Sequence, residues 1–593
     1  MKNIRNFSII AHIDHGKTTL TDRILEFTGT VKASHATRIM DSNPIEQERG
    51  ITIKLAPVRL DYKGYILNLI DTPGHVDFAY EVSRSLKACD GAVLVVDATK
   101  GIQAQTLANY DKAVEHNLHI IPVINKIDLD SAEPEKTADE LVSILGFKKE
   151  DILYVSAKTG VGVEGLLDAI TAKVPPPRIS PSKDNELKAL VFNSTFDIHK
   201  GVIAFVEVVQ GQINSQNLDR LVLYQAQEPM NPLEIGFFTP LMTASSILNT
   251  GEVGYIATGH KDIRDVTIGD TVTTKGSLIT PIEGYERPLP MVFMDLYPGD
   301  AGDFRLLATA LEKLALNDAS LTFTITASPA LGHGFRVGFL GILHAEIVSE
   351  RLFQEFGVSC VNTTPSVPYR LTLSNYEHSE ISSPADYPTP ESIKEVQEPF
   401  ILLTIYTPES YVGAVMELAQ TKRAEFIDMQ YPAPGKAKLE YLMPLAELIT
   451  NFYDRLKSVS SGYASVEYEH AGYQPVDAVK VDILLNSEPA SALSFICPRI
   501  QAEGKGRALV EKLKVVIPRS QIEVAIQASI GGKIIARSTV KAYRKDVTAK
   551  LHGGDMTRNR KLLEKQKKGK KKMKMLGNVA VPTSAFTEIL KIT

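Results

Sequence analysis

The feature that most constrains the fold is a set of short polar segments in the first 160 residues, most of which directly follow an apolar run. The segments are AHIDHGKT (11–18), RGIT (49–52), DTPGH (71–75), NKID (125–128) and SAK (156–158). The apolar runs are 7–10, 65–70, 91–97, 120–124 and 152–155. Such runs, separated by helical stretches, predict a parallel sheet covered on both faces. The polar segments then lie at the carboxyl ends of strands, where such sheets bind ligands. We assign no chemistry of its own to the run 91–97.

The first segment has the pattern of a phosphate-binding loop, G-x-x-x-x-G-K-[ST], except that Ala11 replaces the first glycine. It lies between a strand and an amphipathic helix predicted at 19–25, so backbone N–H groups and a helix N-terminus can hold anionic oxygens. Gly16 allows a phosphate to approach closely, Lys17 reaches the β- and γ-phosphates, and the Thr18 hydroxyl can bind Mg²⁺.

The next two segments supply the remaining groups of a magnesium–phosphate site. Asp71 can hold a Mg²⁺-bound water, and the Gly74 N–H can sense the γ-phosphate. Thr52 would complete the Mg²⁺ shell only when the γ-phosphate is present, so we expect its segment to order and release.

The last two segments predict recognition of a guanine base. The Asp128 carboxylate can accept hydrogen bonds from N1–H and the exocyclic amine of guanine, which adenine lacks, and Asn125 assists. Lys126 can lie along the base plane, and the Ala157 N–H can reach the guanine oxygen. The candidate nucleotide-binding residues are Asp14, His15, Gly16, Lys17, Thr18, Thr19, Gly74, Asn125, Lys126, Asp128, Ser156, Ala157 and Lys158.

His75 narrows the class, because many small GTPases have a glutamine at this position to orient the attacking water. Together with Ile13-Asp14-His15 in the phosphate loop, it resembles the translational GTPases, the family of elongation factors Tu and G. The resemblance implies that His75 positions the hydrolytic water and that Asp14 helps to bind a monovalent cation. It also implies that Ile13 and Ile51 form an apolar gate. His75, Lys17 and Asp14 are the candidate catalytic residues.

The length and texture of the chain predict a multidomain α/β and β protein of five parts. The proline-rich stretch 174–178 closes the first part as a stiff linker, and short strands set off by glycines then suggest a small β-barrel. The predicted parts are a P-loop GTPase domain (1–178), a β-barrel domain (184–285), an α+β module (288–372), a ferredoxin-like βαββαβ module (395–483) and a basic α+β C-terminal domain (484–593).

Both middle modules are predicted to have a ferredoxin-like mixture of helices and strands. The first has helices at 304–316 and 340–353 around a strand at 321–326; the second has strands at 399–406, 424–431, 437–443 and 464–468 and helices at 411–422 and 445–457. We interpret 374–390 as a linker and 332–336 as a glycine-rich turn.

The C-terminal part carries a dense positive charge. Residues 541–575 contain 14 Lys or Arg and three acids, a balance of +11 in a chain of net charge −5. Such asymmetry suits a grip on a polyanion, although composition alone also allows a solvated tail. The candidate RNA- or ribosome-binding residues are Arg558, Arg560, Lys561, Lys565, Lys567, Lys568, Lys570, Lys571, Lys572 and Lys574.

Segments in the same region resemble the C-terminal domain of the elongation factor 4 (LepA) family: IPR (517–519), IQASIGGKIIAR (526–537) and GGD (553–555), followed by the basic run. The resemblance implies a monomeric, ribosome-dependent GTPase that uses GTP, GDP and Mg²⁺. It further implies action on stalled or mistranslocated ribosomes, where the factor moves tRNA backward and contacts ribosomal RNA.

Composition favours a cytoplasmic factor. Cys89, Cys360 and Cys497 are far apart, as expected for free thiols in a reducing compartment. The chain has no apolar run of 18 residues, and its first strand starts too close to Met1 for a targeting peptide. The family resemblance also implies peripheral association with the cytoplasmic face of the plasma membrane, which the basic run could support electrostatically.

Three alternatives remain open at this point. One is another translational GTPase of the translocase or ribosome-protection type, although such proteins have a further domain where this chain has only 374–390. The second is a GTPase subunit of nucleotide-sulfate metabolism, which would not need the basic run. The third is a membrane-surface scaffold with GTP as a structural ligand, which leaves His75 and Thr52 without a role.

Overall fold

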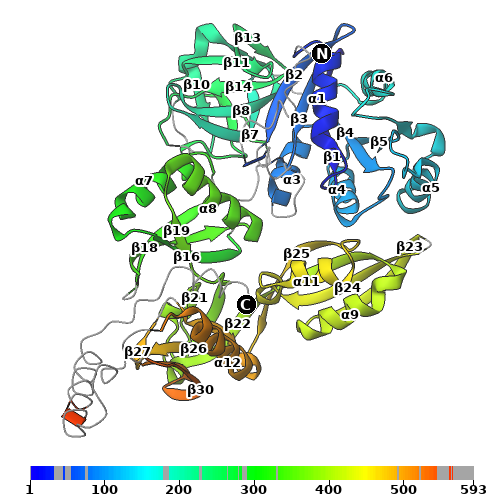
Figure 1. The fold of residues 1–593 in the computed structure, drawn as a ribbon. Helices are drawn as coiled ribbons and strands as arrows, with labels where there is room; N and C mark the ends of the chain where they lie inside the picture. The colour runs from blue at the N-terminus through cyan, green and yellow to red at the C-terminus, as the bar shows by residue number, and fades with distance from the viewer. Residues whose placement is uncertain are drawn as a thin grey trace, which may run out of the picture.

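A computed structural model describes most of the chain, and the strands in it form separate sheets along the sequence (Figure 1). The described residues are 2–31, 45–46, 52, 55–73, 78–177, 186–225, 230–262, 265–277, 279–282, 290–318, 320–328, 331–433, 435–490, 493–519, 523–543, 560–561 and 564.

The first body is a six-stranded sheet in the order β2-β3-β1-β4-β5-β6 with helices on both faces (Figure 1). Its strands are β1 (Ile4–Ala11), β2 (Ala56–Tyr62), β3 (Tyr65–Asp71), β4 (Gly91–Asp97), β5 (His119–Asn125) and β6 (Leu153–Tyr154). Its helices are α1 (Lys17–Phe27), α3 (Ala79–Lys87), α4 (Ala104–Glu115), α5 (Pro134–Leu145) and α6 (Val163–Lys173). Five strands are parallel, as predicted.

The edge strand β2 was not predicted, and it differs from the other five strands because it forms an antiparallel hairpin with β3. The two turn residues, Lys63 and Gly64, both have positive φ, 47° and 83°. This geometry matches the right-handed twist of paired strands, so the hairpin closes with only two residues.

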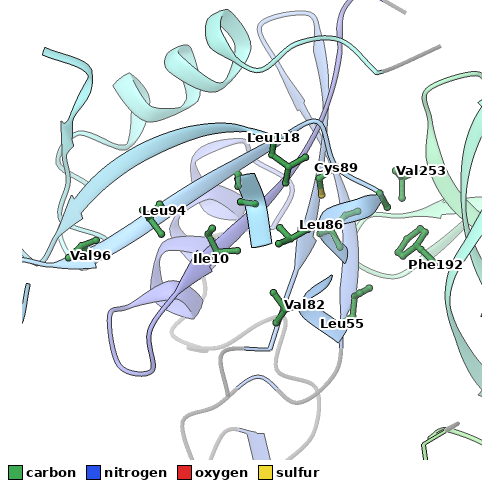
Figure 2. Close-up of a cluster of buried hydrophobic side chains, with 14 of the residues drawn as sticks. Ile10, Leu55, Val82, Leu86, Cys89, Leu94, Val96, Leu118, Phe192 and Val253 are labelled. Carbon is green, nitrogen blue, oxygen red and sulfur yellow. The ribbon is translucent and has the colours of Figure 1, made fainter. Parts of the chain in front are cut away.

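The central strands are buried on both faces, which explains their continuous apolar sequences. In β1, Phe7 and Ile9 pack into one core with α1 and α6, whereas Ile10 packs into the other core with α3 and α4. Figure 2 shows the second of these cores, where Phe192 and Val253 from the next body also lie. The first two bodies therefore share one hydrophobic core.

The second body is entirely antiparallel, with a seven-stranded sheet in the order β10-β15-β7-β8-β14-β11-β12 and a separate β9–β13 pair. Its strands are β7 (Lys188–Asp197), β8 (Gly201–Gln210), β9 (Gln212–Asn214), β10 (Leu221–Leu223), β11 (Glu234–Phe238), β12 (Met242–Ser245), β13 (Ile247–Asn249), β14 (Val253–Ala257) and β15 (Thr271–Thr274). Both sheets contribute to one apolar core, as expected for a small barrel.

The third body has the ferredoxin-like order of elements and the strand order β17-β18-β16-β19. Its elements are β16 (Val292–Pro298), α7 (Phe304–Ala315), β17 (Thr322–Ser328), β18 (Gly332–Phe339), α8 (Ile342–Phe356) and β19 (Cys360–Asn362). The prediction of a turn at 332–336 is wrong, because these residues begin β18. Gly334 suits a strand here since an added Cβ would meet the Leu296 oxygen and the Tyr297 ring at 2.6 Å.

The fourth body again follows a βαββαβ order, with β25 and β24 on either side of β22. Its elements are β20 (Tyr369–Leu373), β21 (His378–Ile381), β22 (Ile393–Pro408), α9 (Val412–Thr421), β23 (Glu425–Ala433), β24 (Lys436–Pro444), α10 (Leu445–Leu448), α11 (Phe452–Val459) and β25 (Ser465–Pro475).

Two predictions for this body are wrong. The segment 374–390 is not a plain linker: it contains β21, which pairs with β20, and β20 in turn pairs with β22. The helix predicted at 445–457 is interrupted between α10 and α11, where Asn451 precedes the second helix. Asn451 has φ −91° and ψ 24°, outside the α-helical region, and this breaks the helix before α11.

The fifth body packs one long helix on an antiparallel sheet. Its elements are β26 (Ala478–Leu485), β27 (Glu488–Pro489), β28 (Phe495–Pro498), α12 (Arg499–Val516), β29 (Val524–Ile530) and β30 (Lys533–Val540). The predicted apolar flank at 579–590 lies outside the described residues.

The fourth body lies beside α4 and α5 of the first body (Figure 1). Lys436 pairs with Glu140 across this boundary at 2.8 Å, and Lys112 lies 3.7 Å from Glu467. Among the helices of the described residues, none has an apolar stretch long enough to cross a bilayer.

Candidate guanine-nucleotide site

The phosphate loop turns sharply between β1 and α1 because two of its residues adopt left-handed backbone conformations. Asp14 has φ 65° and Gly16 has φ 92°. Gly16 is required on steric grounds as well, since an added Cβ would collide with the Asn125 side-chain amide. Lys17 then begins α1, so the helix N-terminus faces the loop. Thr18 is half-buried and Thr19 exposed in the first turn of this helix.

Lys17, Thr52 and Asp71 come from three separate segments and meet in the interior. The Lys17 ammonium donates to Asp71 Oδ1 at 2.7 Å and to Thr52 Oγ1 at 3.0 Å. All three side chains are buried, with Asp71 fully so. The sequence predicted their proximity, but the direct ion pair between Lys17 and Asp71 was not predicted.

The same cluster has the donors that a magnesium ion prefers. The second carboxylate oxygen of Asp71, Oδ2, is buried and has no hydrogen-bond partner among the described residues. A buried carboxylate oxygen without a partner is costly, and a cation or a cation-bound water would satisfy it. With the hydroxyls of Thr18 and Thr52, the oxygen-rich donor set fits Mg²⁺.

Asn125 joins the two halves of the site. Its side-chain amide donates to the His15 carbonyl at 2.9 Å, and its oxygen accepts from the Ala157 N–H at 3.0 Å. Asn125 thus ties the phosphate loop to the SAK segment. The Ala157 N–H, predicted to reach the guanine oxygen, is bonded to Asn125 in this arrangement.

Asp128 and Ser156 face each other in the same region. The Ser156 hydroxyl donates to Asp128 Oδ1 at 2.7 Å and accepts from the Thr159 N–H at 3.1 Å. These bonds fix the orientation of the Asp128 carboxylate and leave its second oxygen for a ligand.

Asp97 is a site residue that the sequence interpretation missed, and assigning no chemistry to 91–97 was wrong. It ends β4, is fully buried, and lies 2.8 Å from the Lys126 ammonium. Lys126 also donates to the Asp14 carbonyl at 2.5 Å. Burial raises the pKa of Asp97, but hydrogen bonds from Lys126 and Thr99 outweigh it, and the pKa is lowered overall. Its position offered a signal, because Asp71 and Asn125 also end parallel strands.

His15 is a buried residue of the phosphate loop, in surroundings that favour the neutral imidazole. Burial lowers the pKa of His15 well below its usual value, and the neighbouring His12 lowers it further. Its Nδ1 accepts from the Asp97 N–H at 3.2 Å, which fixes the neutral tautomer. This environment assigns His15 a role in shaping the loop.

The sequence interpretation also missed two residues, Arg23 and Gln105, that hydrogen-bond to segments of the site. Arg23 of α1 donates to the carbonyls of Ala157 at 3.1 Å and Lys158 at 2.7 Å, which holds the SAK segment on α1. Gln105 of α4 accepts from the Ile13 N–H at 3.3 Å. Both are polar residues on helices, without a motif that would distinguish them from surface residues.

Several predicted site residues lie outside the described residues. Near the nucleotide these are Ile51, Gly74 and His75; in the basic run they are Arg558, Lys565, Lys567, Lys568, Lys570, Lys571, Lys572 and Lys574. Arg560 and Lys561 are described and exposed, and Arg560 lies 3.6 Å from Glu564. No group of three metal-ligating residues with His, Cys, Asp or Glu side chains occurs in the described part of the chain.

Comparison with protein families gives three matches along the chain. Residues 2–176 match the elongation factor Tu GTP-binding domain, 395–484 the elongation factor G C-terminus, and 485–591 the C-terminus of the GTP-binding protein LepA. The first match covers the body that contains the site described above.

Similar proteins extend over the full length. Proteins named elongation factor 4 are 51% identical in Fusobacterium nucleatum (100% of this chain, 98% of the relative), 49% in Desulfitobacterium hafniense (99% and 98%) and 50% in Thermus thermophilus (100% and 98%). A crystal structure of another Thermus thermophilus protein shares the fold at a TM-score of 0.57 and 18% identity, covering 80% of this chain and 98% of that one.

Proposed function

The chain belongs to the elongation factor 4 (LepA) family of translational GTPases, and from this we propose that it hydrolyses GTP on the ribosome and acts there on stalled or mistranslocated complexes. The chain is a GTP hydrolase that binds GTP and GDP with Mg²⁺. Our proposal adds the substrate state, in which tRNA is moved backward through the ribosome.

The observation that carries the proposal is the meeting of Lys17, Thr52 and Asp71 at one edge of the sheet. A lysine from the phosphate loop, a threonine and a carboxylate are the parts that phosphoryl transfer uses to hold phosphates and Mg²⁺. In our proposal Lys17 moves from Asp71 to the β- and γ-phosphates when GTP binds. Thr18 and Thr52 would hold Mg²⁺ through their hydroxyls, and Asp71 would hold it through a bound water.

In our proposal the guanine base is recognised by the NKID (125–128) and SAK (156–158) segments. We assign the hydrogen bonds to the guanine N1–H and amine to Asp128, whose carboxylate Ser156 orients. Lys126 lies along the base, and Asn125 keeps the phosphate loop and the SAK segment at a fixed separation. Mg²⁺, when bound, neutralises charge that develops on the phosphates.

Hydrolysis itself is assigned to His75, which orients the attacking water once the ribosome engages the factor. Asp14, with its left-handed backbone, is proposed to help hold a monovalent cation beside the phosphates. Ile13 and Ile51 form the apolar gate through which His75 approaches. Loss of the γ-phosphate releases Thr52 and its segment, and this lowers the affinity for the ribosome.

The ribosome supplies polyanionic partners for the C-terminal body. We propose that the basic residues between 558 and 574 bind ribosomal RNA or tRNA through phosphate contacts. We further propose that the protein acts as a monomer in the cytoplasm. Its proposed domains are 1–178, 184–285, 288–372, 395–483 and 484–593. Peripheral contact with an anionic membrane would use the same basic residues.

The alternative functions make different demands on the site. A translocase or ribosome-protection factor is disfavoured, since the full-length relatives are named elongation factor 4 and 485–591 matches the LepA C-terminus. A GTP-regulated membrane scaffold would need to bind GTP but would not need to hydrolyse it.

The test is whether purified ribosomes accelerate GTP hydrolysis by this chain. We expect an increase of at least about 1000-fold, the scale on which a partner completes a GTPase site. An unchanged rate with active ribosomes, alongside normal GDP binding, would contradict the ribosomal function and favour the scaffold.

A further inference from the structure

Asp97 organises the turn that follows β4. Its backbone oxygen accepts from the N–H groups of Lys100 at 3.2 Å and Gly101 at 2.9 Å. Its Oδ1 accepts from both the N–H and the hydroxyl of Thr99 at 2.8 Å. Because Asp97 makes these bonds while its Oδ2 faces Lys126, the turn 97–102 and the nucleotide site share one buried carboxylate.

The other end of this turn is held from outside the nucleotide site. The Ile102 N–H donates to Glu140 Oε2 at 2.9 Å, and the Lys436 ammonium donates to the Ile102 carbonyl at 3.0 Å. Lys436 also pairs with Glu140 Oε2 at 2.8 Å. The backbone N–H and the backbone carbonyl of Ile102 are thus both hydrogen-bonded to the Lys436–Glu140 ion pair, which joins the fourth body to the first.

This ion pair is well shielded from solvent. The side chains of Lys436 and Glu140 are 24% and 12% exposed, so water screens their attraction less than at an open surface. Gly101 leaves room for the pair, because an added Cβ would collide with the Glu140 carboxylate and lie 3.0 Å from the Lys436 ammonium. Gly101 also has φ 65°, which favours glycine.

The path from Lys436 to the nucleotide loops is therefore short and continuous. It runs from Lys436 to Ile102, through the bonded turn to Asp97, and from Asp97 to Lys126 and the phosphate loop. Lys126 in turn donates to the Asp14 carbonyl. Asp97, Gly101 and Ile102 are buried along this path, whereas Thr99, Lys100 and Asp14 are exposed and Lys126 is partly exposed.

We propose that Lys436, in the 395–484 module, is a positioning residue for the guanine-nucleotide site and acts through the turn 97–102 on Asp97 and Lys126. The inference rests on the proposed function in one respect, that Lys126 lies along a bound guanine base. Since coupling between two sites is reciprocal, nucleotide binding also changes how firmly the module docks on α5.

The experiment compares variants of the full-length chain by the rate at which each releases a fluorescent GDP analogue. Lys436→Gln should release it about threefold to tenfold faster than the parent, the range expected for residues on a coupling path. Lys436→Arg keeps the charge and should restore release to within about twofold of the parent.

Lys438→Gln is the matched control. Lys438 is two residues away on β24, is 25% exposed, and pairs with Glu440 at 2.6 Å. It lies near Asp111 of α4 across the same boundary, and among the described residues its ion pair is with Glu440 and not with the turn 97–102. Release at the parent rate in Lys438→Gln, with faster release in Lys436→Gln, would support transmission through the turn. Equal effects in the two glutamine variants, or none in Lys436→Gln, would overturn the inference.

Asp97→Asn tests the route itself. Alone it should accelerate release more than Lys436→Gln, and adding Lys436→Gln to it should have little further effect, because the route is already broken. Additive effects would show that Lys436 acts by another route and overturn the inference. If Asp97→Asn fails to fold, the inference is still tested by comparing the release rates of Lys436→Gln, Lys436→Arg and Lys438→Gln. Failure of the parent to bind GDP would instead contradict the proposed function.

Discussion

The ammonium of Lys17 lies 2.7 Å from Asp71 Oδ1, an ion pair between the first residue of α1 and the last residue of β3. The pair is buried, and Thr52 accepts a further hydrogen bond from the same ammonium. A buried ion pair of this kind is poised for exchange, because phosphate oxygens and a divalent cation can replace each partner with a stronger one.

Asp71→Asn should therefore weaken the binding of Mg²⁺ at the nucleotide site, so that more Mg²⁺ is needed to retain GTP. The amide keeps the size of the side chain but loses the negative charge that holds a Mg²⁺-bound water. We expect the Mg²⁺ concentration for half-maximal retention of GTP to rise by at least about tenfold. The measurement is a Mg²⁺ titration of GTP release. Asp90→Asn is the control. Asp90 is also buried, but it precedes Gly91, the first residue of β4, and so lies at the edge of the sheet opposite to the nucleotide site. A similar shift in both variants would mean a general loss of stability.

His75→Ala should leave GTP affinity within about threefold of the parent, because we assign the side chain to the water and not to the nucleotide. Ribosome-stimulated turnover should fall by at least about 100-fold, the scale of a positioned acid–base or orienting group. The two quantities are measured by GTP titration and by phosphate release with ribosomes. Comparable turnover in variant and parent would remove His75 from the mechanism.

Asp128→Asn should weaken GTP binding and shift preference toward xanthine nucleotides. The new amide can donate to the xanthine oxygen, where the carboxylate would accept from the guanine amine. Loss of a charge-assisted bond of roughly 2–4 kcal/mol corresponds to a fall in affinity of about 30- to 1000-fold. Competition between GTP and XTP measures the shift. Unchanged guanine selectivity would place base recognition elsewhere.

Replacing Lys567, Lys568, Lys570, Lys571 and Lys572 by Gln should flatten the salt dependence of ribosome or RNA binding. Each lost phosphate contact lowers the slope of log affinity against log salt by somewhat under about one unit. The measurement is a salt titration of binding for parent and variant. Intrinsic GTP binding should stay unchanged, because the nucleotide site is in the first body. Parallel slopes would favour a solvated tail.

The carboxylate of Asp318 should make the free energy of unfolding of the third body decrease as the pH falls into the acid range. His344 Nδ1 accepts from the Leu340 N–H at 3.1 Å, so its Nε2–H donates to Asp318 at 2.8 Å. Burial raises the pKa of Asp318, but His344 and Ser320 outweigh it and lower the pKa below its usual value. A lowered folded-state pKa adds stability that is present above about pH 4, the unfolded pKa, and is lost as the pH falls below it.

The corresponding experiment compares urea unfolding of the parent and Asp318→Asn between about pH 7 and pH 3. Because the variant cannot ionise at this position, the stability advantage of the parent should be constant near neutrality and shrink below about pH 4. A difference that is independent of pH would show that Asp318 contributes through its shape and not through its charge.

Much of the nucleotide site could be predicted because its signals are local. A buried parallel strand requires a continuous apolar run, and the residue after the run lies at the ligand-binding edge whatever its neighbours are. Asp71, Asn125 and Ser156 were located in this way. The positive charge of 541–575 is likewise a property of composition and needs no knowledge of packing.

The tertiary structure alone decided which distant groups meet. Nothing near Asp97 in the sequence indicates Lys126 or His15, and Lys436 is nearly 300 residues from Glu140. The segment 374–390 has a linker composition, yet β21 is a strand because β20 offers it an unpaired edge. Strand partners and interbody ion pairs depend on packing across the whole chain, whereas local apolar patterns and turn residues depend only on a few neighbouring positions.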